Sequence, residues 1–255
     1  MEDDSLRKLQ RDNARLTSDN VDLEELTVEL ARSNKDLERF AYVASHDLSE
    51  PLRAVSAFSQ RLADRYRGKL DADADEYIDF ILDGTERMRS LIEALLAYSR
   101  LGRAELRLAV VDTGALVADV LTSLGSERIA FVDVGELPAV TADPTQLAQV
   151  FQNLIGNALK FVDDEAPAVR VTAEREGDGW RFDIADNGIG IDPRYAERIF
   201  DVFERLHTRE SYPGAGIGLS ICQRVIERHG GRISVMPGED GGTVFSFTLP
   251  DREAP

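Results

Sequence analysis

Two amides and an ammonium group lie at spacings that could bind a charged ligand. Asn153, Asn157 and Lys160 are four and three positions apart, so they share one face of a predicted helix. Amide oxygens on that face could bind Mg²⁺, and the lysine could contact a phosphate. A solvated helix face would explain the lysine but explains two spaced asparagines poorly. We therefore take this face as the first part of a candidate site for an anion and a metal.

Two glycine clusters could form the remainder of such a site. Residues 186–190 (DNGIG) end a predicted strand, and residues 214–218 (GAGIG) open a predicted helix. Backbone N–H groups at a glycine-rich helix start can approach an anion closely. A carboxylate at a strand end, here Asp186, can accept a hydrogen bond from an exocyclic amine such as that of adenine. The second cluster lacks the βαβ context and the downstream acid of a dinucleotide-binding fingerprint, so we reject that interpretation.

His46 is the candidate nucleophile of the first half of the sequence. A heptad frame places Ala41 at position a and Ala44 at position d, so His46 falls at f, away from the predicted helix seam. A neutral imidazole that faces outward can attack a donor group, although a lone histidine on a helix is more often structural. Geometry alone favours Glu50 as its partner, because residues i and i+4 meet on a helix whereas the adjacent Asp47 does not.

Together these motifs resemble those of the sensor histidine kinases of two-component systems. Four segments are similar to the N, G1, F and G2 boxes of that family, and a fifth is similar to its phosphoacceptor H box. In this order they are residues 157–160 (NALK), 186–190, 200–203 (FDVF), 214–219 (GAGIGL) and 45–52 (SHDLSEPL). Residues 50–53 (EPLR), 203–209 (FERLHTR) and 226–231 (IERHGG) are most similar to the kinase module of bacterial phytochromes. The resemblance covers nearly the whole chain.

The resemblance implies a Bergerat-type ATP-binding domain in the second half of the chain. In it Asp186 would contact adenine, Asn157 would hold Mg²⁺ as the metal ligand and Lys160 would touch phosphate. Residues 204–213 would form a lid whose cations offset the negative charge of the chain. The expected nucleotide-binding residues are Asn153, Asn157, Lys160, Asp186, Gly188, Gly190, Phe203, Arg205, His207, Arg209, Gly214, Gly216, Gly218 and Leu219.

The resemblance further implies that His46 is the phosphoacceptor and Asp47 its base, so we place Asp47 before Glu50 in that role. We expect a homodimer in which His46 is autophosphorylated from Mg-ATP and passes the phosphoryl group to an aspartate of a response regulator. One alternative is a net phosphatase, but Glu50 takes the place of the Thr or Asn that many kinases of this type carry there. The other is a non-catalytic dimeric scaffold that binds nucleotide, and the intact motifs argue against it.

The composition excludes several other classes of protein. The 255 residues carry 30 basic and 47 acidic side chains, a net charge of -17 that repels a phosphate backbone, so we expect no nucleic-acid partner. The single cysteine, Cys222, excludes an intrachain disulfide, a multi-cysteine zinc site and an iron–sulfur cluster. The sequence has no apolar run near the ~18 residues of a membrane span and no signal peptide. We therefore expect a cytoplasmic protein without a membrane partner.

A predicted coiled coil precedes His46. Leucine occupies each d position from Leu9 to Leu37, and three a positions hold asparagine, which is typical of a parallel two-stranded coiled coil. These asparagines are Asn13, Asn20 and Asn34. Because the chain starts inside this pattern, we expect an upstream sensory domain that the chain lacks.

The helices around His46 are expected to form a hairpin. The heptad frame predicts one helix from about Leu6 to Tyr66, bent at Pro51, where a backbone hydrogen bond is lost. Residues 67–71 form a turn, and a second amphipathic helix follows as far as a hinge at 101–103. Two such hairpins form a four-helix bundle in a dimer.

The remaining elements predict an α+β sandwich, with helices on one face of a mixed sheet. The predicted strands are residues 108–111, 129–134, 169–173, 181–184, 233–235 and 244–249, and the predicted helices are 114–124, 144–161 and 216–229. We divide the chain into a coiled-coil linker (1–38), a dimerisation and phosphotransfer domain (39–101), an ATP-binding domain (106–250) and a tail (251–255).

Overall fold

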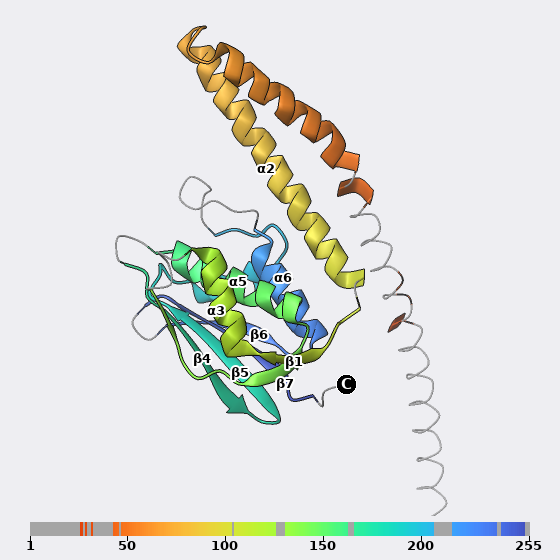
Figure 1. Cartoon of the computed structure of the whole chain (residues 1–255), viewed down its shortest axis with the longest axis vertical. Coiled ribbons are helices and arrows are strands. Elements are labelled where there is room, and N and C mark those ends of the chain that lie inside the picture. Colours follow the sequence, from red (N-terminus) through yellow and green to blue (C-terminus); the bar gives the residue numbers. More distant parts are fainter. Residues whose placement is uncertain are drawn as a thin grey trace, which may run out of the picture.

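The computed structural model contains a helical hairpin and an α/β sandwich (Figure 1). It describes residues 26, 27, 29, 32, 43–45, 47–103, 105–125, 131–162, 166–206, 216–238 and 241–252. Of the predicted coiled coil, residues 26, 27, 29 and 32 are described and are helical. The remainder of that segment, with the asparagines of its seam, lies outside the described residues, so the coiled coil stays a prediction.

The predicted hairpin is confirmed. Its first helix is helical at residues 43–45 and 47–66, and its second, α2, spans Ala72–Arg103. The turn between them depends on Gly68, which adopts φ +73° and donates its N–H to both carboxylate oxygens of Asp75 at 3.0 Å. Positive φ carries no steric cost at glycine, which explains the residue at this position.

We expected two interruptions in the hairpin helices, a bend at Pro51 and a hinge at residues 101–103. The first helix continues through Pro51, and the bend we expect there stays a prediction. The hinge we placed at residues 101–103 is wrong, because α2 includes these residues. A single glycine such as Gly102 costs a helix only about 1 kcal/mol, which favourable neighbours easily offset.

Large apolar side chains remain exposed on the hairpin. Phe58 and Phe80 keep 68% and 73% of their surface accessible, whereas Leu52, Ala63 and Ile78 are buried between the two helices. Val55, Leu62, Tyr77, Ile81 and Met88 are also exposed. So many exposed apolar groups on one small element are typical of a surface that another chain covers.

The sandwich has three helices on one face of a five-stranded sheet (Figure 1). The sheet order is β2-β4-β5-β7-β6; β2 runs parallel to β4, and the other neighbours are antiparallel. A separate two-stranded sheet pairs β1 with β3. The bounds are β1 Ala109–Asp112, α3 Thr113–Leu124, β2 Val132–Val134, β3 Ala139–Ala142, α5 Pro144–Lys160, β4 Val169–Glu176, β5 Gly179–Asp186, α6 Gly218–Arg228, β6 Ile233–Pro237 and β7 Thr243–Pro250.

The predicted α+β sandwich with a mixed sheet is confirmed, with differences in detail. We did not predict β3, because its four residues give too little alternation to distinguish a strand from a loop. Strands β4 and β5 are longer than expected and pair along their whole length up to the turn at residues 177–178. The outer end of β4, residues 174–176, is polar and exposed, so its apolar pattern ends before the strand does.

The core forms where α5 packs on the sheet. Phe151 of α5 contacts Phe182 of β5 and Phe247 of β7 edge-to-face, with ring centroids 5.8 and 5.5 Å apart. Phe182 and Phe247 stack at 5.0 Å, and all three rings are fully buried. Each such pair adds about 0.5–1.5 kcal/mol beyond the burial of its apolar area. This packing fixes the buried face of α5 and thereby directs its asparagines to another side.

Candidate nucleotide-binding site

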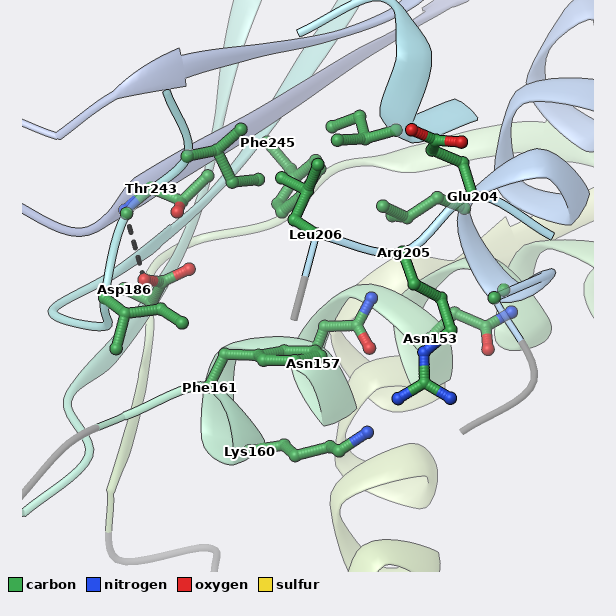
Figure 2. Close-up of a pocket in the computed structure, with 17 residues that line it drawn as sticks. Asn153, Asn157, Lys160, Phe161, Asp186, Glu204, Arg205, Leu206, Thr243 and Phe245 are labelled. Carbon is green, nitrogen blue, oxygen red and sulfur yellow. Dashed lines mark hydrogen bonds between the residues drawn. The ribbon is translucent and has the colours of Figure 1, made fainter. Parts of the chain in front are cut away.

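A cavity of about 290 Å³ lies beside α5, between the end of β5 and the start of α6 (Figure 2). Its walls combine polar groups from α5 with apolar side chains from β7 and from the segment between β5 and α6. The residues that line it are Asn153, Asn157, Lys160, Phe161, Asp186, Ile189, Gly190, Ile191, Ile199, Glu204, Arg205, Leu206, Gly216, Gly218, Leu219, Thr243 and Phe245. A flat apolar group and an anion could both fit such a cavity.

The polar face of α5 is positioned as its spacing predicts. Asn153, Asn157 and Lys160 line the cavity, while Leu154 and Ile155 on the opposite face are fully buried in the core. Gly218 at the start of α6 packs against the first asparagine, and a Cβ at this position would lie 3.1 Å from Asn153 Oδ1. A glycine therefore permits the close approach of the two helices at this end of the cavity.

Asp186 lies at the end of β5, where its carboxylate is held by two backbone groups. Oδ1 accepts a hydrogen bond from the N–H of Gly188 at 2.8 Å. It also accepts one from the N–H of Thr243 at 3.1 Å, which Figure 2 shows. Burial raises the pKa of Asp186, and these two hydrogen bonds oppose the rise. Since both bonds fix Oδ1, the carboxylate has a defined orientation with which to accept a hydrogen bond from a ligand.

Gly188 shapes this turn but does not itself line the cavity. A Cβ here would lie 2.2 Å from the carbonyl oxygen of Phe161, at the end of α5, so the backbones meet too closely for any side chain. Gly190 does line the cavity, with φ +74°. The glycine cluster of residues 186–190 thus joins the end of β5 to the end of α5.

Two cations converge on one part of the cavity. Figure 2 shows the Arg205 guanidinium and the Lys160 ammonium on the same side of it. Burial, and next the positive charge of Arg205, lower the pKa of Lys160. A bound polyanion would relieve the repulsion between these two charges, so this part of the cavity fits phosphate groups.

A backbone hydrogen bond joins the residues that flank the predicted lid, residues 204–213. The N–H of Phe203 donates to the carbonyl of Gly216 at 3.0 Å, which joins the two ends of the segment. Phe203 adopts φ +70°, is half-exposed and lies outside the cavity lining, so the structure does not place it as a ligand contact. The predicted site residues His207, Arg209 and Gly214 lie outside the described residues.

Sequence reasoning missed the apolar wall and the second partner of Asp186. Phe161, Ile189, Ile191, Ile199, Thr243 and Phe245 line the cavity but were not predicted, and Glu204 and Leu206 were expected only as part of the lid. Phe245 faces inward from β7 with the same alternation as the core residue Phe247, so the pattern does not distinguish a cavity wall from a core. The glycines before Thr243 gave no signal, because the contact depends on strand pairing between β5 and β7.

The predicted phosphoacceptor segment lies on the hairpin. Asp47 and Glu50 are exposed on the first helix, whereas His46 lies outside the described residues. The side chain of Ser45 is fully buried. The exposed positions of both acids agree with the heptad frame, which placed the neighbouring histidine away from the seam.

Two family models match the chain, one for each part of the structure. Residues 36–104 match the His Kinase A (phospho-acceptor) domain, and residues 142–253 match the histidine kinase-, DNA gyrase B-, and HSP90-like ATPase domain. The chain belongs to the sensor histidine kinases. The first match includes His46 with both acids, and the second includes the described residues that line the cavity.

Relatives of this kinase include two cyanobacterial phytochromes. It is 45% identical over 233 residues to "Phytochrome-like protein Cph1" of Synechocystis sp., which covers 90% of this chain and 31% of the relative. It is 46% identical over 232 residues to "Cyanobacterial phytochrome A" of Nostoc sp., which covers 90% of this chain and 30% of the relative. The chain therefore spans about a third of the length of these relatives.

Solved structures of histidine kinases share the fold. Full-length ShkA in complex with AMPPNP matches with a TM-score of 0.61 at 33% identity, covering 85% of this chain and 47% of that chain. ThkA in complex with the response regulator protein TrrA matches with a TM-score of 0.58 at 25% identity, covering 84% of this chain and 64% of that chain. Within the described part of the kinase, no helix is long and apolar enough to cross a membrane.

Proposed function

We propose that this chain is an ATP-dependent protein-histidine kinase module that phosphorylates its own His46 and then transfers the phosphoryl group to an aspartate of a response regulator. In this proposal residues 39–101 dimerise and carry the phosphoacceptor, residues 106–250 bind ATP, and residues 1–38 connect them to a sensory domain. The observation that carries it is one cavity lined by Asp186, Asn157 and Lys160, on a chain that also has the H-box motif.

Each wall of the cavity has a role in this proposal. Asp186 accepts a hydrogen bond from the adenine amine, and the apolar wall with Phe245 and Ile191 encloses the ring. Lys160 and Arg205 neutralise the phosphates, and they hold the terminal phosphate in place for attack. Gly190, Gly216 and Gly218 line the cavity and let the backbone approach the nucleotide, while Gly188 shapes the turn that holds Asp186.

The residues present fit a magnesium ion bound mainly through the nucleotide. Among the described residues no group of three or more His, Cys, Asp or Glu side chains could hold a metal on its own. Mg²⁺ in phosphoryl-transfer sites is bound by few protein groups together with substrate phosphates, and the amide of Asn157 lies where it would supply one ligand. When bound, the ion would neutralise charge on the phosphates.

The hairpin supplies the acceptor. A ring nitrogen of His46 forms a bond to the γ-phosphorus of ATP while the bond from that phosphorus to the ADP oxygen breaks, and the imidazole proton passes to a neighbouring carboxylate. Asp47 is our first choice for this carboxylate and Glu50 the second. Both are exposed on the first helix. Glu50 also stands where phosphatase action would need a group that positions water, which disfavours a net phosphatase.

Three kinds of partner follow from this proposal. The exposed apolar side chains of the hairpin, such as Phe58 and Phe80, support a homodimer in which a second copy covers them. A related kinase, ThkA, has been solved with a response regulator, which supports a partner of that class here. The phytochrome relatives support an upstream sensory domain and a cytoplasmic location.

Labelling with γ-³²P-ATP tests the proposal. His46→Gln should abolish incorporation of label while binding of ATP stays unchanged, because the acceptor and the cavity belong to different parts of the fold. The parent chain, incubated in parallel and then mixed with a response regulator, should lose its label to that protein. Equal labelling of the His46→Gln variant and the parent would overturn the assignment of the acceptor.

A further inference from the structure

A buried histidine lies where α5 begins and α6 ends, away from the cavity. His229 is 3% exposed, with Nδ1 2.8 Å from the carbonyl oxygen of Val225 and Nε2 3.0 Å from the backbone nitrogen of Asp143. A carbonyl can only accept and a backbone N–H can only donate. The ring is therefore neutral, with its proton on Nδ1 and the lone pair of Nε2 accepting the N–H of Asp143.

Asp143 joins several segments of the chain at this point. As the N-cap of α5 its Oδ1 accepts from the N–H groups of Thr145 and Gln146, both at 3.1 Å. Its Oδ2 accepts from the N–H of Arg107 at 3.1 Å, in the segment that precedes β1. The start of α5 is thus bonded to the C-terminal end of α6 through His229 and to the segment before β1 through Arg107.

A second side-chain bond crosses between the same two helices. Nη1 of Arg228, in the last turn of α6, donates to Oε1 of Gln146 at 3.4 Å. Gln146 in turn donates from Nε2 to Oδ2 of Asp143 at 3.4 Å. In a capping box the N–H of Asp143 would donate to the side chain of Gln146, but here that N–H donates to His229.

The opposite ends of these two helices form the cavity. Asn157 and Lys160 lie near the C-terminal end of α5, and Gly218 and Leu219 lie at the N-terminal end of α6. Fourteen residues separate Asp143 from Asn157, or about 21 Å at ~1.5 Å per residue. A tilt of roughly 3° about the start of α5 would therefore move Asn157 by about 1 Å, enough to cost on the order of 10²-fold in rate.

We propose that His229 is a positioning residue of the nucleotide site, because its Nε2 bonds the start of α5 to the C-terminal end of α6 and so fixes how the ligand-binding ends of both helices face each other. The inference rests on the proposed function, since it concerns the same cavity. The two hydrogen bonds of the His229 ring have different roles in this proposal. The bond from Nδ1 to Val225 lies within α6 and caps that helix, whereas the bond to Nε2 crosses to α5.

A matched pair of variants distinguishes these two bonds. The amide of His229→Gln reaches the position of Nε2 and can accept the N–H of Asp143, whereas the shorter amide of His229→Asn reaches the position of Nδ1 and can bond only to Val225. In the full chain we expect the glutamine variant to bind a fluorescent ATP analogue within about 2-fold of the parent. We expect the asparagine variant to bind it about 10-fold more weakly, because without the bond from α6 to α5 the ligand-binding ends of the two helices can shift out of register.

Thermal unfolding followed by circular dichroism identifies the temperatures at which both variants are folded. Affinities are compared at those temperatures, so that a loss of stability is not mistaken for a loss of affinity. The KM for ATP of autophosphorylation should rise with the dissociation constant in the asparagine variant and stay near the parent value in the glutamine variant. Equal affinities in the two variants would overturn the inference and leave His229 as a cap of α6. If the parent itself does not bind the analogue, the proposed function fails instead.

The dependence of ATP-analogue affinity on pH provides a second test, with His229→Gln as the reference. Protonation of Nε2 removes the lone pair that accepts the N–H of Asp143. The charged groups around the ring are Asp143, Arg228 and Arg252, so one acid and two bases surround it. Burial lowers the pKa of this ring, so affinity for the analogue should fall more steeply in the parent than in His229→Gln as the pH is lowered below about 6.5. Identical pH profiles would contradict the positioning role.

Discussion

Two carboxylates compete for the role of proton acceptor beside His46. Asp47 and Glu50 are both exposed on the first helix, so neither carboxylate is buried away from the surface on which we expect His46. We predict that Asp47→Asn lowers the rate of autophosphorylation by roughly 10²-fold, the lower range for loss of a general base. Glu50→Gln, an equally conservative change on the same helix, should lower it far less. Rates from single-turnover labelling at saturating ATP decide which carboxylate is the base. A larger loss of rate in the Glu50→Gln variant would assign the base to Glu50.

Close backbone contact at Gly188 gives a second prediction at the scale of residues. A Cβ at Gly188 would meet the carbonyl oxygen of Phe161 at 2.2 Å, whereas at Gly156, inside α5, the nearest atom lies 4.0 Å away. Gly188→Ala should therefore destabilise the fold by about 1–3 kcal/mol, as overpacking does, and weaken ATP binding. Gly156→Ala is the control and should be neutral or stabilise by about 0.5–1 kcal/mol. Urea unfolding of both variants checks this, and equal midpoints would contradict the contact.

Helices α5 and α6 show at the scale of elements what sequence can and cannot predict. The spacing of Asn153, Asn157 and Lys160 predicted which face of α5 lines the cavity, because a helix places such residues together without help from the rest of the fold. The bond between His229 and Asp143 was not predictable. It joins residues 86 positions apart, and only the packing of α6 beside α5 brings them together.

This bond also predicts a pH dependence of stability. Burial lowers the pKa of His229 in the folded chain below its ordinary value near 6.5, and the hydrogen bond to Val225 and the charge of Asp143 only partly oppose this shift. The unfolded chain then binds the proton more tightly, so the free energy of unfolding falls as the pH drops from about 6.5 toward the folded pKa. The slope attributable to this residue is at most about 1.4 kcal/mol per pH unit.

Urea unfolding of the parent and of His229→Gln between pH 5 and pH 8 measures this slope. The difference between the two curves isolates His229, because the other histidines and the acids are common to both. We expect the curves to run parallel above about pH 7 and to converge or cross below pH 6.5 as the parent loses stability faster. A constant difference throughout the range would show that His229 does not titrate between the folded and unfolded states.

Charge at the scale of the whole molecule is distributed unevenly. The chain has a net charge of -17, yet Lys160 and Arg205 meet at one side of the cavity. Composition argued against nucleic acid as a partner, and the helix pattern predicted where the lysine lies. Neither could predict that Arg205 faces it, because this depends on how the segment after Phe203 returns to Gly216. The exposed apolar groups of the hairpin likewise support the proposal that a second copy of the chain covers them.

The linker before the hairpin carries the last prediction. Its heptad pattern, with asparagines at Asn13, Asn20 and Asn34, predicts a coiled coil of modest stability that leads directly into the first helix. Two arrangements of such an element could differ little in free energy, so that a sensory domain could shift the balance between them. If the helix is continuous, each inserted residue rotates the sensory domain by about 100° relative to the hairpin. Seven insertions restore the phase to within about 20°.

We therefore predict that kinase output varies periodically with the number of residues inserted between Leu23 and Leu37. Zero and seven added residues should give similar autophosphorylation and a similar response to the stimulus, whereas intermediate lengths should give different or inverted output. The measurement is labelling by γ-³²P-ATP for insertions of one to seven residues in the protein that includes its sensory domain, with dimerisation checked by light scattering. A tether without helical phase would instead give a flat or steadily declining output, because rotation would not be transmitted through it.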